Sequence, residues 1–161
     1  MIRKAFFASL LLAPAMSSVA ATLPSAPYLP LEMATEAARQ ALLACAADNH
    51  NVSVAVVGRD GGVKVLLKAD NAGPHTASSA EGKAFTAAAM GRDTAGLAEF
   101  IASKPANDGL RDMDTRMVIQ AGGLPIRFDQ ALVAGIGVGG APSGDIDAAC
   151  AAAGLKAIGA E

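Results

Sequence analysis

The feature that most constrains the fold is a glycine-rich segment near the C-terminal end of the chain. It reads Gly135-x-Gly137-x-Gly139-Gly140 and lies between an expected strand and an expected helix. A dinucleotide-binding fingerprint has a similar arrangement, but Pro142 occupies the position of its third glycine and too little chain follows for the rest of a βαβ unit. Because glycine has no Cβ, the segment instead predicts close packing of a helix against a sheet.

Hydrophobic periodicity and turn residues divide the rest of the chain into helices and strands. The order is helix, two strands, two helices, three strands and helix, which predicts an α+β domain with an antiparallel sheet. Residues 103–116 are predicted to form the longest loop. The expected helices are 31–49, 79–90, 94–101 and 145–153, and the expected strands are 52–57, 63–67, 117–120, 124–128 and 131–138.

The first 21 residues have the layout of a secretory signal peptide. Arg3 and Lys4 precede an apolar run over 5–16, and small residues follow up to Ala21. A membrane anchor is the alternative, but Pro14 interrupts a run that is shorter than the ~20 apolar residues needed to cross a bilayer. We therefore expect cleavage near Ala21 and a periplasmic or secreted protein.

The remaining chain, roughly 140 residues, is long enough for one domain with a core and too short for two. We expect a linker at 22–30, which carries three prolines, and a single domain at 31–161. The formal net charge is −2 and no run of lysine or arginine occurs after the expected cleavage site. These features exclude an extended nucleic-acid-binding surface.

Cys45 and Cys150 are the only cysteines, and each lies in an alanine-rich segment expected to be helical. In an oxidising compartment they can form a disulfide. Two buried free thiols, which behave as small hydrophobic side chains, are an equally good interpretation of the sequence.

Few side chains have the spacing of a catalytic or metal site. His50 and His75 are isolated, so no zinc or calcium cluster is predicted, and His75 in a glycine-containing loop is the freer of the two to contact a ligand. Ser78 and Glu81 have the spacing of a capping box. Ser143 is expected to cap the last helix, whose N-terminus either binds an anion or, the favoured interpretation, is simply capped.

Charged residues concentrate in and after the second expected helix, which also carries Phe85 and Met90. This helix either has a solvated face and a face that packs in the core, or it supports a flat apolar ligand. The charged residues are Glu81, Lys83, Arg92 and Asp93.

Five sequence blocks, in order along the chain, resemble the GlcG/HbpS-like haem-binding family, also known by its DUF336-type domain. The likeness extends over residues 31–155 and implies a profilin-like fold in which a five-stranded antiparallel sheet lies between helices. It also implies assembly into a homo-oligomer and non-covalent binding of b-type haem or a related tetrapyrrole. The blocks are DNAGP at 70–74, SAEGKAFTA at 79–87, TAGL at 94–97, GGLPI at 122–126 and AGIGVGGAPSGD at 134–145.

The resemblance also suggests roles for individual residues. Thr94 matches a family threonine and is expected nearest the haem iron, although a threonine before a short helix is also an ordinary cap. His75 is the alternative iron ligand. Lys83 and Arg92 are expected to pair with the haem propionates, and Glu81 matches the acidic residue of its block.

The predicted function is that of an exported haem-binding protein involved in haem or iron capture or in slow, peroxide-dependent haem degradation. Two alternatives remain at this stage. One is a sensing accessory protein that acts on a membrane sensor or uptake partner. The other is a protein that binds or transforms a different small metabolite in the same pocket.

Overall fold

The computed structural model describes residues 24–161. The expected signal peptide, residues 1–21, lies outside the described residues, as do the first two residues of the expected linker. No helix within 24–161 is both long enough and apolar enough to cross a membrane.

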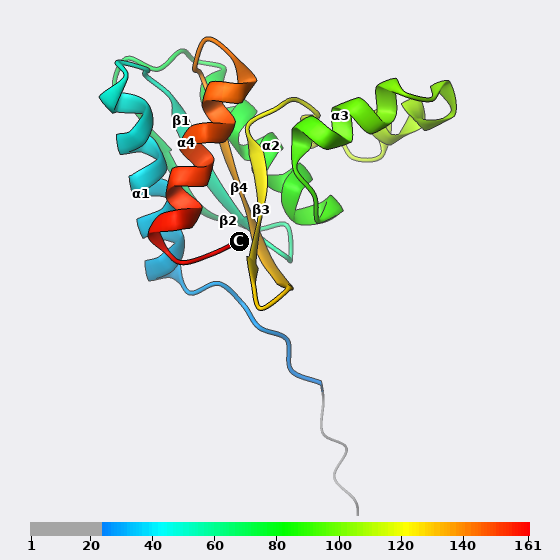
Figure 1. Cartoon of the computed structure of the whole chain (residues 1–161), viewed down its shortest axis with the longest axis horizontal. Coiled ribbons are helices and arrows are strands. Elements are labelled where there is room, and N and C mark those ends of the chain that lie inside the picture. Colours follow the sequence, from blue (N-terminus) through cyan, green and yellow to red (C-terminus); the bar gives the residue numbers. More distant parts are fainter. Residues whose placement is uncertain (1–23) are drawn as a thin grey trace, which may run out of the picture.

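Four strands, four α-helices and one 3-10 helix make up the domain (Figure 1). The first half comprises α1 (Leu31–Ala47), β1 (Ser53–Gly58), β2 (Val63–Lys68) and α2 (Thr76–Met90). The second half comprises α3 (Thr94–Ala102), η1 (Pro105–Asp112), β3 (Gly123–Phe128), β4 (Ala131–Gly139) and α4 (Gly144–Ala157).

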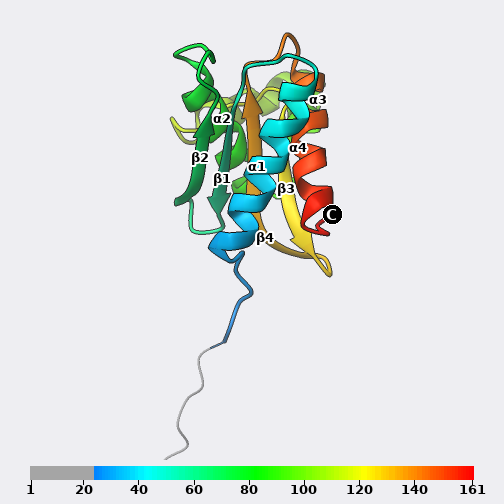
Figure 2. The same ribbon diagram turned by 90° about the vertical axis from the view of Figure 1, so that its left-hand side faces the viewer.

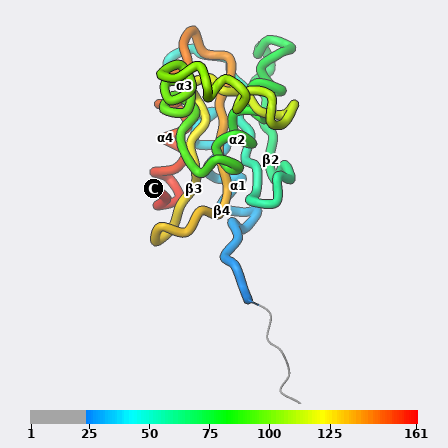
Figure 3. The backbone as a smooth tube through the Cα atoms, turned by 90° about the vertical axis from the view of Figure 1, so that its right-hand side faces the viewer, coloured from blue at the N-terminus to red at the C-terminus, as the bar shows by residue number. Residues whose placement is uncertain are grey.

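The strands form one antiparallel sheet in the order β2-β1-β4-β3. Helices α1 and α4 pack side by side on one face of it, and α2 covers the other (Figures 1 and 2). Helix α3 and η1 follow on the α2 side and lie at the outside of the domain (Figure 3). The α+β class, with an antiparallel sheet flanked by helices, is therefore confirmed.

The predicted number of five strands is wrong for the described residues, which contain four. Residues 117–120 do not pair with the sheet. Val118 instead donates its backbone N–H to Thr86 Oγ1 of α2 at 2.9 Å, with a longer contact to the carbonyl oxygen of Gly82 at 3.4 Å. A short apolar segment whose backbone forms hydrogen bonds with a helix has the same local sequence pattern as a short strand. The profilin-like relationship stays a prediction.

Two predicted helix starts also differ from the structure. Helix α2 begins at Thr76, so the capping box of Ser78 and Glu81 does not form, and Ser78 Oγ donates to the carbonyl oxygen of His75. Asp93 rather than Thr94 caps α3, because its carboxylate accepts the N–H of Gly96 at 2.6 Å. The predicted cap of α4 by Ser143 is present.

Close packing of α2 on β4 confirms the interpretation of the glycine-rich segment. Side chains alternate between the two faces of a strand. On β4, Ile136 and Val138 point into the core beneath α1 and α4, while the glycines between them face α2. A Cβ on Gly137 would overlap the carbonyl oxygen of Ala80 and the backbone nitrogen of Ala84. The helix backbone therefore lies directly on the strand backbone.

A disulfide joins Cys45 of α1 to Cys150 of α4, with the Cα atoms 5.5 Å apart. It closes a loop between residues 105 positions apart. In the chain-entropy model, closing a loop of roughly 100 residues stabilises a fold by about 4.7 kcal/mol. Leu29, from the segment expected to be a linker, is also buried in the core under these helices.

Substitution of Gly137 by alanine tests the contact between α2 and β4. The added methyl group has no space, so we expect the free energy of unfolding to fall by about 1–3 kcal/mol, or folding to fail. Gly109→Ala is the matched control, because nothing lies within 4 Å of a Cβ there, and it should change stability by no more than about 0.5 kcal/mol. Equal stability of the two variants in urea unfolding would contradict the packing described.

Candidate functional site

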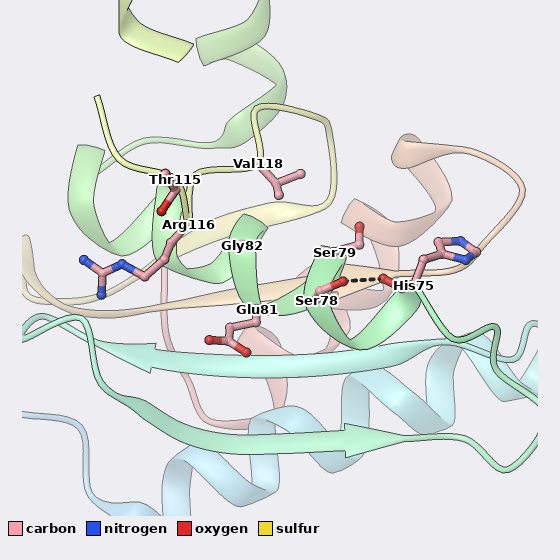
Figure 4. A pocket seen from close by; sticks show the side chains of 8 residues that line it. All are labelled: His75, Ser78, Ser79, Glu81, Gly82, Thr115, Arg116 and Val118. Atoms are coloured by element: carbon pink, nitrogen blue, oxygen red, sulfur yellow. Dashed lines mark hydrogen bonds between the residues drawn. The ribbon is translucent and has the colours of Figure 1, made fainter. Parts of the chain in front are cut away.

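A pocket of about 470 Å³ lies along the outer face of α2. Its volume falls within the ~300–1,000 Å³ typical of small-molecule sites. Figure 4 shows its lining, with His75 and Arg116 at opposite ends and Glu81 between them. The lining residues are His75, Ser78, Ser79, Glu81, Gly82, Thr115, Arg116 and Val118.

Two segments far apart in the sequence form this pocket, and Gly82 allows them to meet. A Cβ on Gly82 would overlap the Val118 side chain and lie 2.8 Å from the carbonyl oxygen of Arg116. Thr86, one turn further along α2, holds the second segment through its hydroxyl, which accepts the N–H of Val118 and donates to the carbonyl oxygen of Gly82. The segment that was predicted to be a strand is thus one wall of the pocket.

Arg116 is held at its end of the pocket by two neighbours. Its guanidinium stacks on the Phe85 ring, 3.9 Å from the ring centroid, and donates to both carboxylate oxygens of Asp114 at 3.0 and 2.7 Å. The side-chain hydrogen bonds from Arg116, followed by its backbone N–H, lower the pKa of Asp114 to about 2. The pKa of Arg116 is raised by the same pair, with a smaller contribution from Glu81.

A second pocket, of about 230 Å³, continues beyond Arg116. Arg59 and Phe85 line it together with Arg116, and Arg59 donates to the backbone carbonyl of Ala88 in α2. Two arginines therefore lie at this end of the groove along α2.

His75 and Glu81 are the predicted site residues that the structure brings together. His75 is exposed and immediately precedes α2, while Glu81 is half-buried on the same side of that helix. Within residues 24–161, no three His, Cys, Asp or Glu side chains gather into a possible metal site.

Thr94, Lys83 and Arg92 lie elsewhere. Thr94 is fully buried, and its hydroxyl donates to the carbonyl oxygen of Gln120 at 2.6 Å and accepts the N–H of Gly123 at 2.9 Å. This arrangement fixes the start of β3 and leaves the hydroxyl no access to a ligand. Lys83 is 2% exposed and pairs with Asp147 of α4 at 2.8 Å.

Arg92 lies in the turn between α2 and α3, where it donates to the carbonyl oxygen of Gly96 and stacks on Phe100, 5.3 Å from the ring centroid. It does not line the pocket along α2. Arg116, which does, was missed because it ends a long polar loop and no sequence motif connects it with α2. The hydrogen bond from Val118 to Thr86 is what places Arg116 beside α2.

The comparisons with known proteins agree with this architecture. A family model described as "Haem degrading protein HbpS-like" matches residues 29–156. The chain belongs to the HbpS-like family. A comparison with curated protein sequences gives no match.

Solved structures extend the comparison for this HbpS-like chain. A double mutant of HbpS from Streptomyces reticuli, with two glutamates changed to aspartate, is 45% identical, has a TM-score of 0.79, and the match covers 89% of this chain and 97% of that one. A PduOC–heme complex is 25% identical with a TM-score of 0.76, over 84% and 98% of the chains. Klebsiella pneumoniae ORFY, at 22% identity, 88% and 98% coverage and a TM-score of 0.81, shares the fold.

Replacing Arg116 with alanine should release Asp114 from its hydrogen bonds. We expect the pKa of Asp114 to rise from about 2 toward its ordinary value of 3.8. Since folding lowers this pKa, the pair stabilises the native state above about pH 4, and this contribution is lost as the pH falls through about 2. A carboxyl-carbon NMR titration measures the change.

Arg111→Ala is the control for this titration. Its guanidinium lies 4.0 Å from Asp108 in a looser pair away from the pocket, so the pKa of Asp114 should not move. If the pKa of Asp114 stays near 2 in Arg116→Ala, a group other than Arg116 lowers it.

Proposed function

We propose that this HbpS-like chain is an exported protein that binds haem in the groove along α2, with His75 as the iron ligand. The observation that carries the proposal is the exposed imidazole of His75 on a pocket of suitable size, in a member of a family described by haem degradation. The heme complex of the structurally similar PduOC supports the same ligand class.

The groove contains a side chain of a type that binds haem iron. Imidazole is a common axial ligand of haem iron, whereas a neutral hydroxyl is not among the usual ones. The hydroxyl of Thr94 is occupied by two backbone groups, while the imidazole of His75 is exposed at one end of the pocket. We therefore propose His75, and not Thr94, as the iron ligand.

The opposite end of the groove has the charge that haem propionates require. Arginine binds carboxylates through paired N–H groups; Arg116 and Arg59 both line this end, and a propionate there would compete with Asp114 for Arg116 and with the Ala88 carbonyl for Arg59. Phe85, beneath Arg116, is ten residues from His75, which corresponds to about 15 Å along the helix axis. These two arginines replace Lys83 and Arg92 as the proposed propionate partners, and Glu81 lies between the two ends.

The state of the cysteines supports non-covalent binding. Covalent c-type attachment uses cysteine thiols in a C-x-x-C-H motif, and the two cysteines of this chain are joined to each other. The signal-peptide pattern of residues 1–21 supports export to the periplasm or the exterior, where such a disulfide persists. Homo-oligomer formation and a membrane sensor or uptake partner stay predictions.

When bound, haem would supply an iron centre that can react with peroxide. The description of the matched family favours slow haem degradation as an activity that accompanies binding. The lining of the groove comes from α2, the residue before it and one flanking segment, so these residues would hold the haem and the iron would supply the chemistry. Loss of the Soret band with release of iron under peroxide tests this activity.

A hemin titration of the chain from Thr22 onward, followed by absorbance, tests the binding site. We expect saturable binding with a Soret shift. His75→Ala should change the bound spectrum and weaken binding at least about tenfold, equivalent to ~1.4 kcal/mol. Arg116→Ala should weaken binding less and leave the spectrum of the bound iron unchanged.

His50→Ala is the matched control, because His50 follows α1 and does not line the groove. It should bind hemin as the unchanged protein does. A linear response like that of free hemin would end the haem proposal. Unchanged binding and spectrum in His75→Ala would end the assignment of the iron ligand.

A further inference from the structure

A third pocket, of about 380 Å³, lies between the end of α1 and the start of α4. These two helices lie side by side on the face of the sheet opposite α2 (Figure 2), so the pocket is separate from the groove along α2. Its volume is within the ~300–1,000 Å³ typical of small-molecule sites. It is lined by Ala44, Asp48, Asp145, Ile146, Ala149 and Cys150.

The pocket reaches only one of the two cysteines in the disulfide that joins α1 to α4. Cys150 lines it and keeps 5% of its surface exposed. Cys45 does not line it and is completely buried, on the face of α1 that carries the alanines of the core. The two ends of one bond therefore differ in access, and a small molecule in the pocket meets the bond at Cys150.

Access decides which sulfur atom reacts when this disulfide meets a thiol. In thiol–disulfide exchange, a thiolate attacks one sulfur atom and the other sulfur leaves as a thiolate. Attack at Cys150 forms a bond from its sulfur to the incoming sulfur and breaks the bond to Cys45. The incoming sulfur is oxidised, the Cys45 sulfur is reduced, and Cys45 takes up the proton that the incoming thiol lost. The products are a mixed disulfide at Cys150 and a Cys45 thiol.

The fold can hold both products. A free Cys45 thiol behaves as a small hydrophobic side chain, and it would stay in an apolar core. The group attached to Cys150 would extend into the pocket. Helices α1 and α4 also pack directly at Gly154, where a Cβ would overlap the carbonyl oxygen of Ala37. The two helices therefore keep a close contact that does not depend on the disulfide.

Two carboxylates determine the charge of the pocket. Asp48 and Asp145 line it beside Cys150, both are exposed, and none of the lining residues is basic. The ion pairs within residues 24–161 are formed by other carboxylates. Like charges repel over about 8 Å at physiological ionic strength. A thiolate that carries further negative charge therefore approaches Cys150 more slowly than one that carries an ammonium group.

We propose that Cys150 is a site of covalent modification, at which small cationic thiols open the disulfide to Cys45. An aminothiol is the class of reactant that the pocket fits, because its sulfur would meet Cys150 while its ammonium group is attracted by Asp48 and Asp145. The inference does not rest on haem binding, since the pocket and the groove along α2 lie on opposite faces of the sheet. Failure of either proposal leaves the other standing.

Mixed-disulfide formation in the oxidised chain from Thr22 onward tests the site. The protein is treated with cysteamine, a cation, or with glutathione, a net anion, then quenched with acid and mapped by peptide mass spectrometry. We expect the adduct at Cys150 with either thiol. Each rate is divided by the rate of the same thiol with the neutral 2-hydroxyethyl disulfide. The corrected rate should be about fivefold higher for cysteamine at low salt, and this advantage should disappear near 1 M salt, where the Debye length is ~3 Å.

Single-cysteine variants trap the adduct and separate the two sulfur atoms. In Cys45→Ser, the Cys150 thiol should form a stable mixed disulfide with cystamine in the folded protein. The Cys45 thiol of Cys150→Ser should react at least about tenfold more slowly until urea unfolds the chain, because reactivity follows access. Mapping of the unchanged chain keeps the test independent of how these variants fold.

Asp48→Asn/Asp145→Asn should remove the advantage of cysteamine over glutathione. Asp108→Asn/Asp112→Asn is the matched control, because it removes two carboxylates from η1, on the α2 side of the domain, and should keep that advantage. An adduct at Cys45, or exchange no faster than global unfolding, would overturn the site. Equal corrected rates for the two thiols would overturn its selectivity for cations.

Discussion

The direct contact of α2 with the backbone of β4 is the interaction on which the rest of the structure depends. Because the α2-facing positions of β4 are glycines, the helix lies on the strand with no side chains between them. The helix then presents its opposite face to residues 115–118, where the backbone N–H of Val118 donates to Thr86 Oγ1 and to the Gly82 carbonyl oxygen. The same contact brings Lys83 under the loop before α4, where it meets Asp147. The groove along α2 follows from this packing.

Two pockets meet at the start of α2 and differ in size and lining. The groove along α2 is larger and more open, with an imidazole at one end and arginines at the other, and it is where we propose that haem binds. A smaller pocket, between the starts of α2 and α4, is polar, and the paired Lys83 and Asp147 are part of its lining. His75 and Ser79 form their common wall.

The sequence predicts the fold better than it predicts the site, for physical reasons. Alternation and turn residues mark the four sheet strands, and the glycine pattern indicates where a helix packs closely. The fifth expected strand, 117–120, fails because local pattern cannot reveal that Thr86 supplies the hydrogen-bond partner. Thr94 and Lys83 belong to recognisable sequence blocks, yet both are buried with structural partners. Arg116 reaches the groove through tertiary contacts, which are its stacking on Phe85 and the bond of Val118 to Thr86.

The location of haem in the groove is the central claim, and paramagnetic broadening tests it most directly. Ferric haem bound to the isotope-labelled protein broadens the backbone amide signals nearest the iron. Haem in the groove would broaden residues 75–82 and 115–118 most strongly and would preserve the signals of α1 and the C-terminal half of α4. Strongest broadening around Thr94 and α3, or on the face covered by α1 and α4, would contradict it.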